Sequence, residues 1–231
     1  MIADRLAEAV LVFNRPYKNP LRGAEIHRID ALTAVKVARL IAGHAAVLER
    51  HMEAAPPGRG LRAVAYLAAV IGQESRFDPR AVNLNLPPAL GILNAAGIGR
   101  PDWSRGDFGI GQFKLKYIRL STDAPELHGL PEREVVERFL YDPDWAVPKV
   151  AARYAGLLRW AEAKVAGFSK RWAAAGAYNR GQTGFLEAYA LRSGPVWEAA
   201  WRHMSRVMGH FDLFLKAITE TERREQNGTI H

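Results

Sequence analysis

Glu74 is the residue best placed to do chemistry, in the segment Ile71-Gly72-Gln73-Glu74-Ser75-Arg76-Phe77-Asp78-Pro79. The apolar residues before it recur at helical spacing. Glu74 extends their stripe near the end of the helix, which Pro79 should stop at Asp78. A carboxyl half inside an apolar wall is poorly solvated, which raises its pKa and suits it to general acid catalysis. The alternative is that Glu74 is solvated on a frayed last turn.

A second candidate segment is rich in glycine, Gly106-Asp107-Phe108-Gly109-Ile110-Gly111-Gln112-Phe113. It ends a long stretch of Asn, Pro and Gly that begins at Pro79, and so long a loop within a compact domain is usually functional or mobile. The glycines lack the dinucleotide spacing and the Lys-Ser/Thr ending of a P-loop, and no βαβ unit surrounds them, which disfavours a nucleotide site. Glycines that let the backbone approach a ligand fit better.

The elements that must position these segments are expected to be helices. Residues 4–13 favour a short helix with Asp4 as its cap, and Asp30 is expected to cap a helix that reaches about Met52. The run of Ala, Pro and Gly at 54–60 is the strongest boundary signal in the chain. We therefore expect a helical extension over 1–57, a main domain over 58–220 and a polar tail over 221–231.

Downstream of the glycine-rich segment the helical pattern resumes. A helix-like segment at 130–140 is followed by a long helix whose apolar face comprises Val150, Tyr154, Leu157, Leu158, Ala161 and Val165. A small-residue helix over 172–181 should end at Gly181 and carry Tyr178 and Asn179 on its last turn. Alternatively, Tyr178 is a core aromatic residue. Pro195 opens a helix with an apolar stripe of Trp197, Trp201, Met204, Met208, Phe211 and Leu215. Strand signals are nearly absent, so the fold class is mainly α.

Composition narrows the class of protein. The chain of 231 residues is 48% hydrophobic and has no cysteine, which excludes a disulfide scaffold, thiolate zinc sites and a cysteine nucleophile. No apolar run is long enough to span a bilayer, and the N-terminus lacks the pattern of a secretory signal. The formal charge of +8 favours anionic partners such as nucleic acid, anionic lipid or the acidic polymers of a bacterial wall. Because the basic residues are scattered, a nucleic-acid partner is disfavoured.

Four landmarks in sequence order, at Glu74–Pro79, Gly109–Phe113, Tyr141–Pro143 and Ala177–Gly181, together resemble the lytic transglycosylase and goose-type lysozyme superfamily. Glu74-Ser75-Arg76-Phe77-Asp78-Pro79 is similar to its catalytic motif Glu-Ser-x-Phe-Asp/Asn-Pro. Gly109-Ile110-Gly111-Gln112-Phe113 is similar to Gly-Leu-Met-Gln-Ile, and Tyr141-Asp142-Pro143 to its Asp-Pro helix entry. Ala177-Tyr178-Asn179-Arg180-Gly181 resembles Ala-Tyr-Asn-x-Gly. Together they cover roughly residues 61–190.

The resemblance implies a lysozyme-like helical domain with a minimal β or loop segment and helical terminal extensions. It also implies cleavage of the β-1,4 bond between N-acetylmuramic acid and N-acetylglucosamine in peptidoglycan, with Glu74 as the single catalytic residue and a 1,6-anhydro-muramyl product. Ser75, Gln112, Tyr178 and Asn179 would hold the sugar and Glu74. Phe108 and Phe113 would offer apolar surface to sugar faces, with core packing expected for one of the two. No metal or cofactor is implied.

The chain also departs from the pattern. Gly111 replaces the usual Met, so that wall of the groove is expected to be more open, and the insertion from Leu84 to Arg105 is long. Asn83 and Asp107 fit a subgroup that resembles the enzymes associated with secretion and conjugation, and we add both to the expected substrate-binding residues. The first sixty residues and the final helix match no pattern.

Two other functions stay open. An inverting hydrolase of the same fold needs a second carboxylate about 6.5–9.5 Å away to activate water, and Asp102 and Asp107 are the nearby candidates. A non-catalytic wall-binding component is the other. Since no signal sequence is recognised, the expected location is a phage virion or delivery to the cell wall or periplasm, with the terminal helices contacting virion or secretion machinery.

Overall fold

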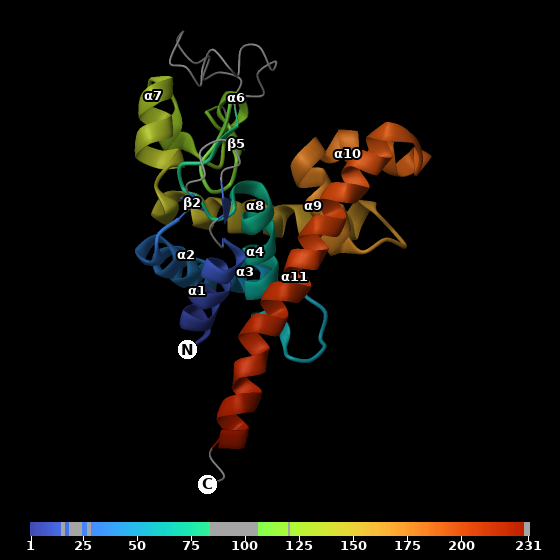
Figure 1. The fold of residues 1–231 in the computed structure, drawn as a ribbon. Coiled ribbons are helices and arrows are strands. Elements are labelled where there is room, and N and C mark those ends of the chain that lie inside the picture. Colours follow the sequence, from blue (N-terminus) through green and yellow to red (C-terminus); the bar gives the residue numbers. More distant parts are fainter. Residues whose placement is uncertain (15–16, 19–24, 27–28, 84–105, 120, 229–231) are drawn as a thin grey trace.

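The computed structural model describes residues 1–14, 17–18, 25–26, 29–83, 106–119 and 121–228, and the fold over these residues is mainly helical, as predicted (Figure 1). The N-terminal part contains α1 (Ile2–Phe13), a small hairpin of β1 (Tyr17–Lys18) and β2 (Glu25–Ile26), α2 (Ala31–His44) and α3 (Ala46–Glu49). Asp30 caps α2 as predicted, because its carboxylate accepts a hydrogen bond from the Thr33 amide at 2.7 Å.

The central part carries the two candidate segments. Helix α4 (Arg59–Ser75) is followed by a three-stranded antiparallel sheet of β3 (Val82–Asn83), β4 (Asp107–Phe108) and β5 (Phe113–Lys114), in that spatial order. In this sheet Asp107 lies opposite both Asn83 and Lys114. Short helical turns follow: α6 (Leu115–Ile118), η2 (Pro125–Leu127), α7 (Glu132–Val135) and η3 (Val136–Leu140).

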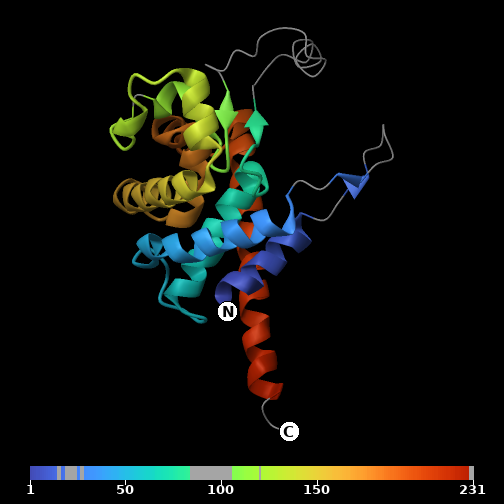
Figure 2. The ribbon, with the colours of Figure 1, turned by 90° about the vertical axis from the view of Figure 1, so that its left-hand side faces the viewer.

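The C-terminal part consists of α8 (Pro143–Lys164), α9 (Lys170–Arg180), α10 (Gln182–Leu191) and α11 (Gly194–Gly228). The predicted apolar face of α8 is buried, and Asp142 caps this helix before Pro143. In both views α11 passes along α4 and extends beyond the body of the molecule (Figure 1, Figure 2). This long helix therefore covers the helix that carries Glu74.

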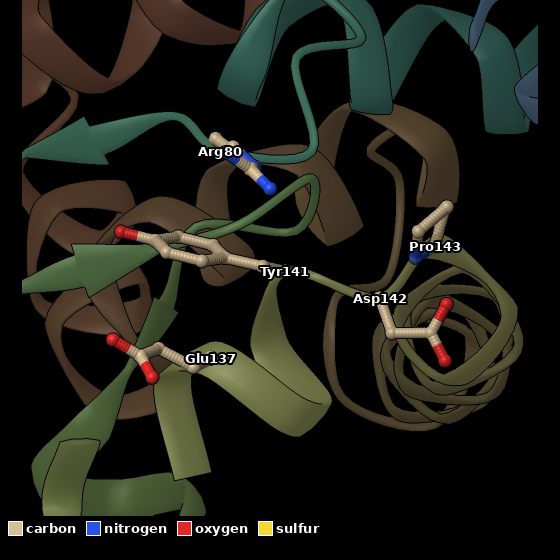
Figure 3. A pocket seen from close by; sticks show the side chains of 5 residues that line it. All are labelled: Arg80, Glu137, Tyr141, Asp142 and Pro143. Carbon is tan, nitrogen blue, oxygen red and sulfur yellow. The ribbon is translucent and has the colours of Figure 1, made fainter. Parts of the chain in front are cut away.

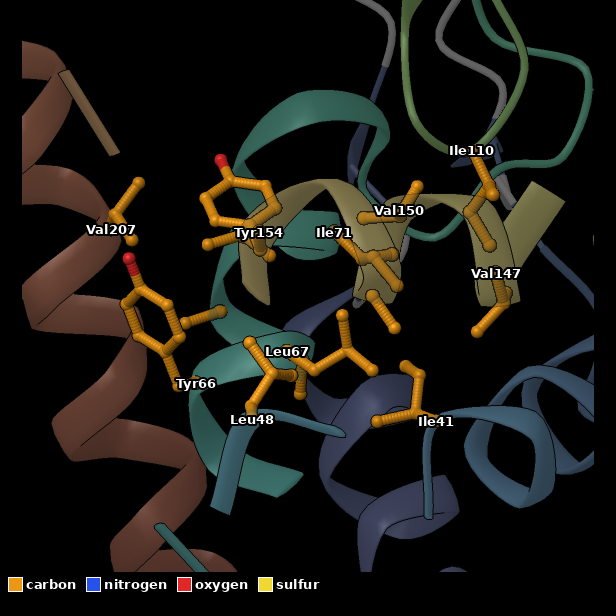
Figure 4. Close-up of a cluster of buried hydrophobic side chains, with 14 of the residues drawn as sticks. Ile41, Leu48, Tyr66, Leu67, Ile71, Ile110, Val147, Val150, Tyr154 and Val207 are labelled. Carbon is orange, nitrogen blue, oxygen red and sulfur yellow. The ribbon is translucent and has the colours of Figure 1, made fainter. Parts of the chain in front are cut away.

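One hydrophobic core joins these parts. Ile41 of α2, Leu48 of α3, Leu67 of α4, Tyr154 of α8 and Val207 of α11 all belong to it (Figure 4). The core runs from Leu6 to Ile218, and the predicted boundary at residue 57 lies in the turn between α3 and α4. The helices on the two sides of that turn therefore pack together.

Several element boundaries differ from the predictions. Asp4 lies in the first turn of α1 and pairs with the N-terminal amine at 3.2 Å, while Met1 occupies the cap position. Residues 31–49 form two helices rather than one, and α11 continues to Gly228 through the predicted tail. The buried face of α11 is wider than predicted. Met204, Met208 and Phe211 are buried as predicted and Trp201 is 43% exposed, whereas Val207, Phe214 and Ile218 are also buried, because α4 and α1 lie on that side.

Candidate active site

Glu74 lies in the last turn of α4, where its side chain is only 12% exposed. Burial and then the negative charge of Asp107, against the opposing charges of Arg153 and Lys114, together raise the pKa of the Glu74 carboxyl from 4.5 to about 8. The carboxyl is therefore enclosed, as predicted, and not solvated on a frayed turn. At neutral pH it retains a proton that it can donate.

The end of α4 is fixed by aromatic packing. The helix stops at Ser75 rather than at Asp78, because Arg76 and Phe77 both adopt left-handed backbone angles (φ of 53° and 65°) that reverse the chain. The buried ring of Phe77 packs edge-on against Phe13 of α1 and Phe214 of α11, with centroids at 5.7 and 5.5 Å. This packing anchors the reversal directly after Glu74.

The turn between β4 and β5 is tied to the segment that follows α4. Gly109 has a φ of 71° and donates its amide hydrogen to the Ala81 carbonyl at 2.9 Å. The side-chain amide of Gln112 donates to the carbonyls of Ala81 and Gly109 at 3.2 and 3.0 Å. The Gln112 nitrogen therefore holds the turn together, and a sugar contact from this residue stays a prediction.

Asp107 lies on β4 and is nearly buried, and its carboxylate contacts the Lys114 ammonium at 3.2 Å. Its charge acts on Glu74, so the two carboxyl groups share one electrostatic environment. Asn83 is placed by its backbone, which pairs with Asp107 in the sheet. Asp102, the other candidate base, and the insertion from Leu84 to Arg105 lie outside the described residues.

Tyr178 reaches the glycine-rich turn from the last turn of α9. Its hydroxyl donates a hydrogen bond to the Gly111 carbonyl, and its ring stacks on Tyr154 with centroids 4.6 Å apart. The Arg153 guanidinium lies 4.9 Å from the centre of the same ring. Burial, followed by the charge of Glu74, raises the pKa of the Tyr178 hydroxyl. Tyr178, which belongs to α9, thus connects the glycine-rich turn with α8 beside Glu74. The neighbouring Asn179 is exposed.

Four aromatic or small residues at the site are packed more tightly than expected. Phe108 and Phe113 face each other across β4 and β5 and are 1% and 2% exposed, so both pack in the core, where one of them was expected. Ser75 is also buried, and its hydroxyl donates to the Ile71 carbonyl at 3.2 Å. A Cβ atom at Gly111 would lie 2.5 Å from the Val150 side chain. The missing Met therefore leaves no extra opening, because Val150 and Phe113 fill the space.

His203 of α11 is the residue that sequence reasoning missed. Its Nε2 atom lies 3.4 Å from Oε1 of Glu74, and its side chain is 11% exposed. Burial, and then the charge of Arg206, lowers the pKa of the His203 imidazole from 6.5 to about 4. At pH 7 the contact therefore joins a neutral imidazole to a protonated carboxyl. The sequence signal that could have found it is helical spacing. His203 comes three residues after Ala200 and four before Val207, so it lies on the same buried face of α11.

Two hollows flank this region. A cleft of about 830 Å³ is lined in part by Phe113, Lys149, Arg153, Arg159 and Ala177, so it adjoins the site and is mainly basic. A second pocket of about 450 Å³ lies at the Asp-Pro landmark (Figure 3), where Tyr141 is flanked by Arg80 and Glu137 at the entry to α8.

Neither the protein-family models nor the curated proteins nor the solved structures that were searched gave a match to this chain. Within the part of the chain that the structure describes, no three His, Asp or Glu side chains gather as a metal site would require. Among the same residues no helix is both long and apolar enough to cross a membrane. The geometry around Glu74 and the resemblance of the four landmarks are therefore the indications of function.

Proposed function

We propose that this protein cleaves the β-1,4 bond between N-acetylmuramic acid and N-acetylglucosamine in peptidoglycan, with Glu74 as the single acid and base. The observation that carries the proposal is the enclosed Glu74 carboxyl, whose pKa of about 8 keeps it protonated at neutral pH. A general acid must hold its proton at the working pH. The closeness of three sequence landmarks, around Glu74, Gly111 and Tyr178, further supports it.

The proposed reaction uses the Glu74 carboxyl twice, first as an acid and then as a base. Glu74 donates its proton to the glycosidic oxygen as the bond from C1 to that oxygen breaks, and the N-acetylglucosamine side leaves as an alcohol. The C6 hydroxyl of the muramyl residue then bonds to C1, and its proton returns to the Glu74 carboxylate. Acid–base assistance contributes about 10²–10⁴-fold, and a tethered nucleophile can remove about 7–11 kcal/mol of the barrier.

The basic cleft beside the site supports an acidic polymer as substrate. Arg153 and Arg159 line it together with Lys149, and peptidoglycan carries carboxylates on its muramic acid and stem peptides. The net charge of +8 favours the same partner over a neutral glycan. We extend the proposal to action at the bacterial wall, in a phage particle or after delivery by secretion machinery.

A hydrolase is the second candidate, because Asp107 acts electrostatically on Glu74 and could activate a water molecule. Its carboxylate already contacts the Lys114 ammonium at 3.2 Å, so a water molecule would have to share it with that cation.

Mass analysis of soluble fragments from digested peptidoglycan tests both reactions. Anhydro-muramyl ends, absent with Glu74→Gln, are the expected result, while fragments with reducing ends that disappear in Asp107→Asn would establish the hydrolase. Binding of intact glycan without soluble fragments would identify a wall-binding protein instead.

A further inference from the structure

The contact between His203 and Glu74 joins two elements that are far apart in the sequence. Glu74 ends α4, and His203 lies in α11, outside the segment 61–190 that carries the resemblance. The two side chains meet at 3.4 Å, with exposed fractions of 12% and 11%. Among the described residues neither Oε1 of Glu74 nor Nε2 of His203 has an aligned hydrogen-bond partner. The two atoms therefore face each other, and the Tyr154 hydroxyl, on which the charge of Glu74 acts, likewise has no aligned partner.

The charges around this pair make a direct role for His203 reasonable. Asp107 of β4, Lys114 of β5 and Arg153 of α8 act on Glu74, whereas Arg206 of α11 acts on His203. Two buried tyrosines, Tyr154 and Tyr178, also border the carboxyl. Because the nearby cations are offset by Asp107, the carboxylate that forms on proton donation needs a further hydrogen-bond donor, and a neutral imidazole with hydrogen on Nε2 supplies one.

We propose that His203 is a positioning residue that holds the Glu74 carboxyl and stabilises its carboxylate form through a hydrogen bond from Nε2. This inference rests on the proposed function only for its effect on turnover. At 3.4 Å the contact is longer than an ideal hydrogen bond, and catalytic hydrogen bonds often shorten when substrate binds. The hydrogen bond strengthens Glu74 as an acid and fixes the direction of its proton.

The test compares His203→Phe with His203→Gln, because the glutamine amide nitrogen can occupy the place of Nε2 while phenylalanine has no donor. His210→Phe is the matched control, since His210 lies seven residues further along α11 and packs against Phe13 at 4.8 Å. The primary measurement is a ¹³C NMR titration of the side-chain carboxyls, with the Glu74 signal assigned by its loss in Glu74→Gln. The second measurement is the pH profile of wall digestion.

We expect His203→Phe to raise the pKa of Glu74 by about 1–2 pH units, which corresponds to the loss of one hydrogen bond to a charged group. Turnover should fall about tenfold or more, and the alkaline limb of the pH profile should move to higher pH. His203→Gln should restore most of both properties, and His210→Phe should leave them unchanged.

An unchanged or lowered Glu74 pKa in His203→Phe overturns the proposal. In that case His203 either only packs against Glu74 or accepts a hydrogen bond from its protonated carboxyl. If His203→Phe does not fold, the comparison of His203→Gln with His203→Asn replaces it, since asparagine places its nitrogen short of the Nε2 position. In that comparison, equal Glu74 titrations overturn the proposal. The titration needs no substrate, so absence of wall digestion by the wild-type protein refutes the proposed function and leaves this test valid.

Discussion

Glu74→Gln should make the protein more stable than the wild type, and increasingly so as the pH rises. In the unfolded chain the Glu74 carboxyl has its ordinary pKa of 4.5, and in the folded chain burial raises it to about 8. Between these values the folded state binds more protons than the unfolded state, so wild-type stability falls as pH increases. Glutamine carries no titrating proton and avoids this loss.

The magnitude follows from the two pKa values. Each pH unit in that window changes the free energy of unfolding by about 1.4 kcal/mol, so the advantage of Glu74→Gln should grow by about 4 kcal/mol between pH 5 and pH 8. The pKa of His203 is shifted in the opposite direction to that of Glu74. Its folded pKa of about 4 lies below 6.5, so its contribution to stability is lost as pH falls from 6.5 to 4. Because His203 is present in both proteins, it largely cancels in the difference.

Urea unfolding followed by tryptophan fluorescence at several pH values between 5 and 8 measures this difference. Glu8→Gln is the control, since Glu8 is exposed on α1 and its replacement should change stability little at any pH. A Glu74→Gln difference that is constant over the whole range would show that the carboxyl is not protonated by burial. A difference that is flat to pH 6.5 and changes only above it would show an ion pair with protonated His203, and would refute the reasoning.

Three further substitutions test the surroundings of Glu74. Tyr178→Phe removes the hydrogen bond to the Gly111 carbonyl, so we expect a loss of about 1 kcal/mol in urea unfolding and a clear fall in turnover; unchanged activity per folded molecule would mark Tyr178 as a core residue only. Gly111→Ala places a Cβ atom 2.5 Å from Val150 and should cost about 1–3 kcal/mol in the same assay, whereas wild-type stability would contradict the packing described. Asp107→Asn removes the charge that raises the pKa of Glu74, so the alkaline limb of the activity profile should move to lower pH, and an upward shift would contradict this.

Local patterns were sufficient to predict much of the fold. The apolar spacing of α4 placed Glu74 at the end of a buried face, and the Asp30 cap was predictable because it depends on residues close in the chain. The left-handed angles at Arg76 and Phe77 were not predictable in this way. Non-glycine residues rarely adopt them, and here the packing of Phe77 between Phe13 and Phe214 imposes them.

The candidate site was only partly predictable for the same reason. The resemblance of the motifs implied that the segments of Glu74, Gly111 and Tyr178 lie near one another. The predicted apolar stripe of α11 is buried at Met204, Met208 and Phe211, but packing against α4 widens this face and also turns His203 inward, which the apolar pattern did not indicate. A contact between residues 129 positions apart (203 minus 74) leaves no local signal in a single sequence.

The docking of α11 on α4 has a consequence for the order of events during synthesis. The ribosome delivers α4 long before α11, so the face of α4 that α11 covers stays open while the intervening helices are made. During that interval the Glu74 carboxyl lacks the cover of His203, and we expect it to ionise closer to its ordinary pKa of 4.5. Its capacity to act as an acid therefore arises late, when the last helix closes over it, and a nascent or truncated chain that lacks α11 should leave glycan uncut.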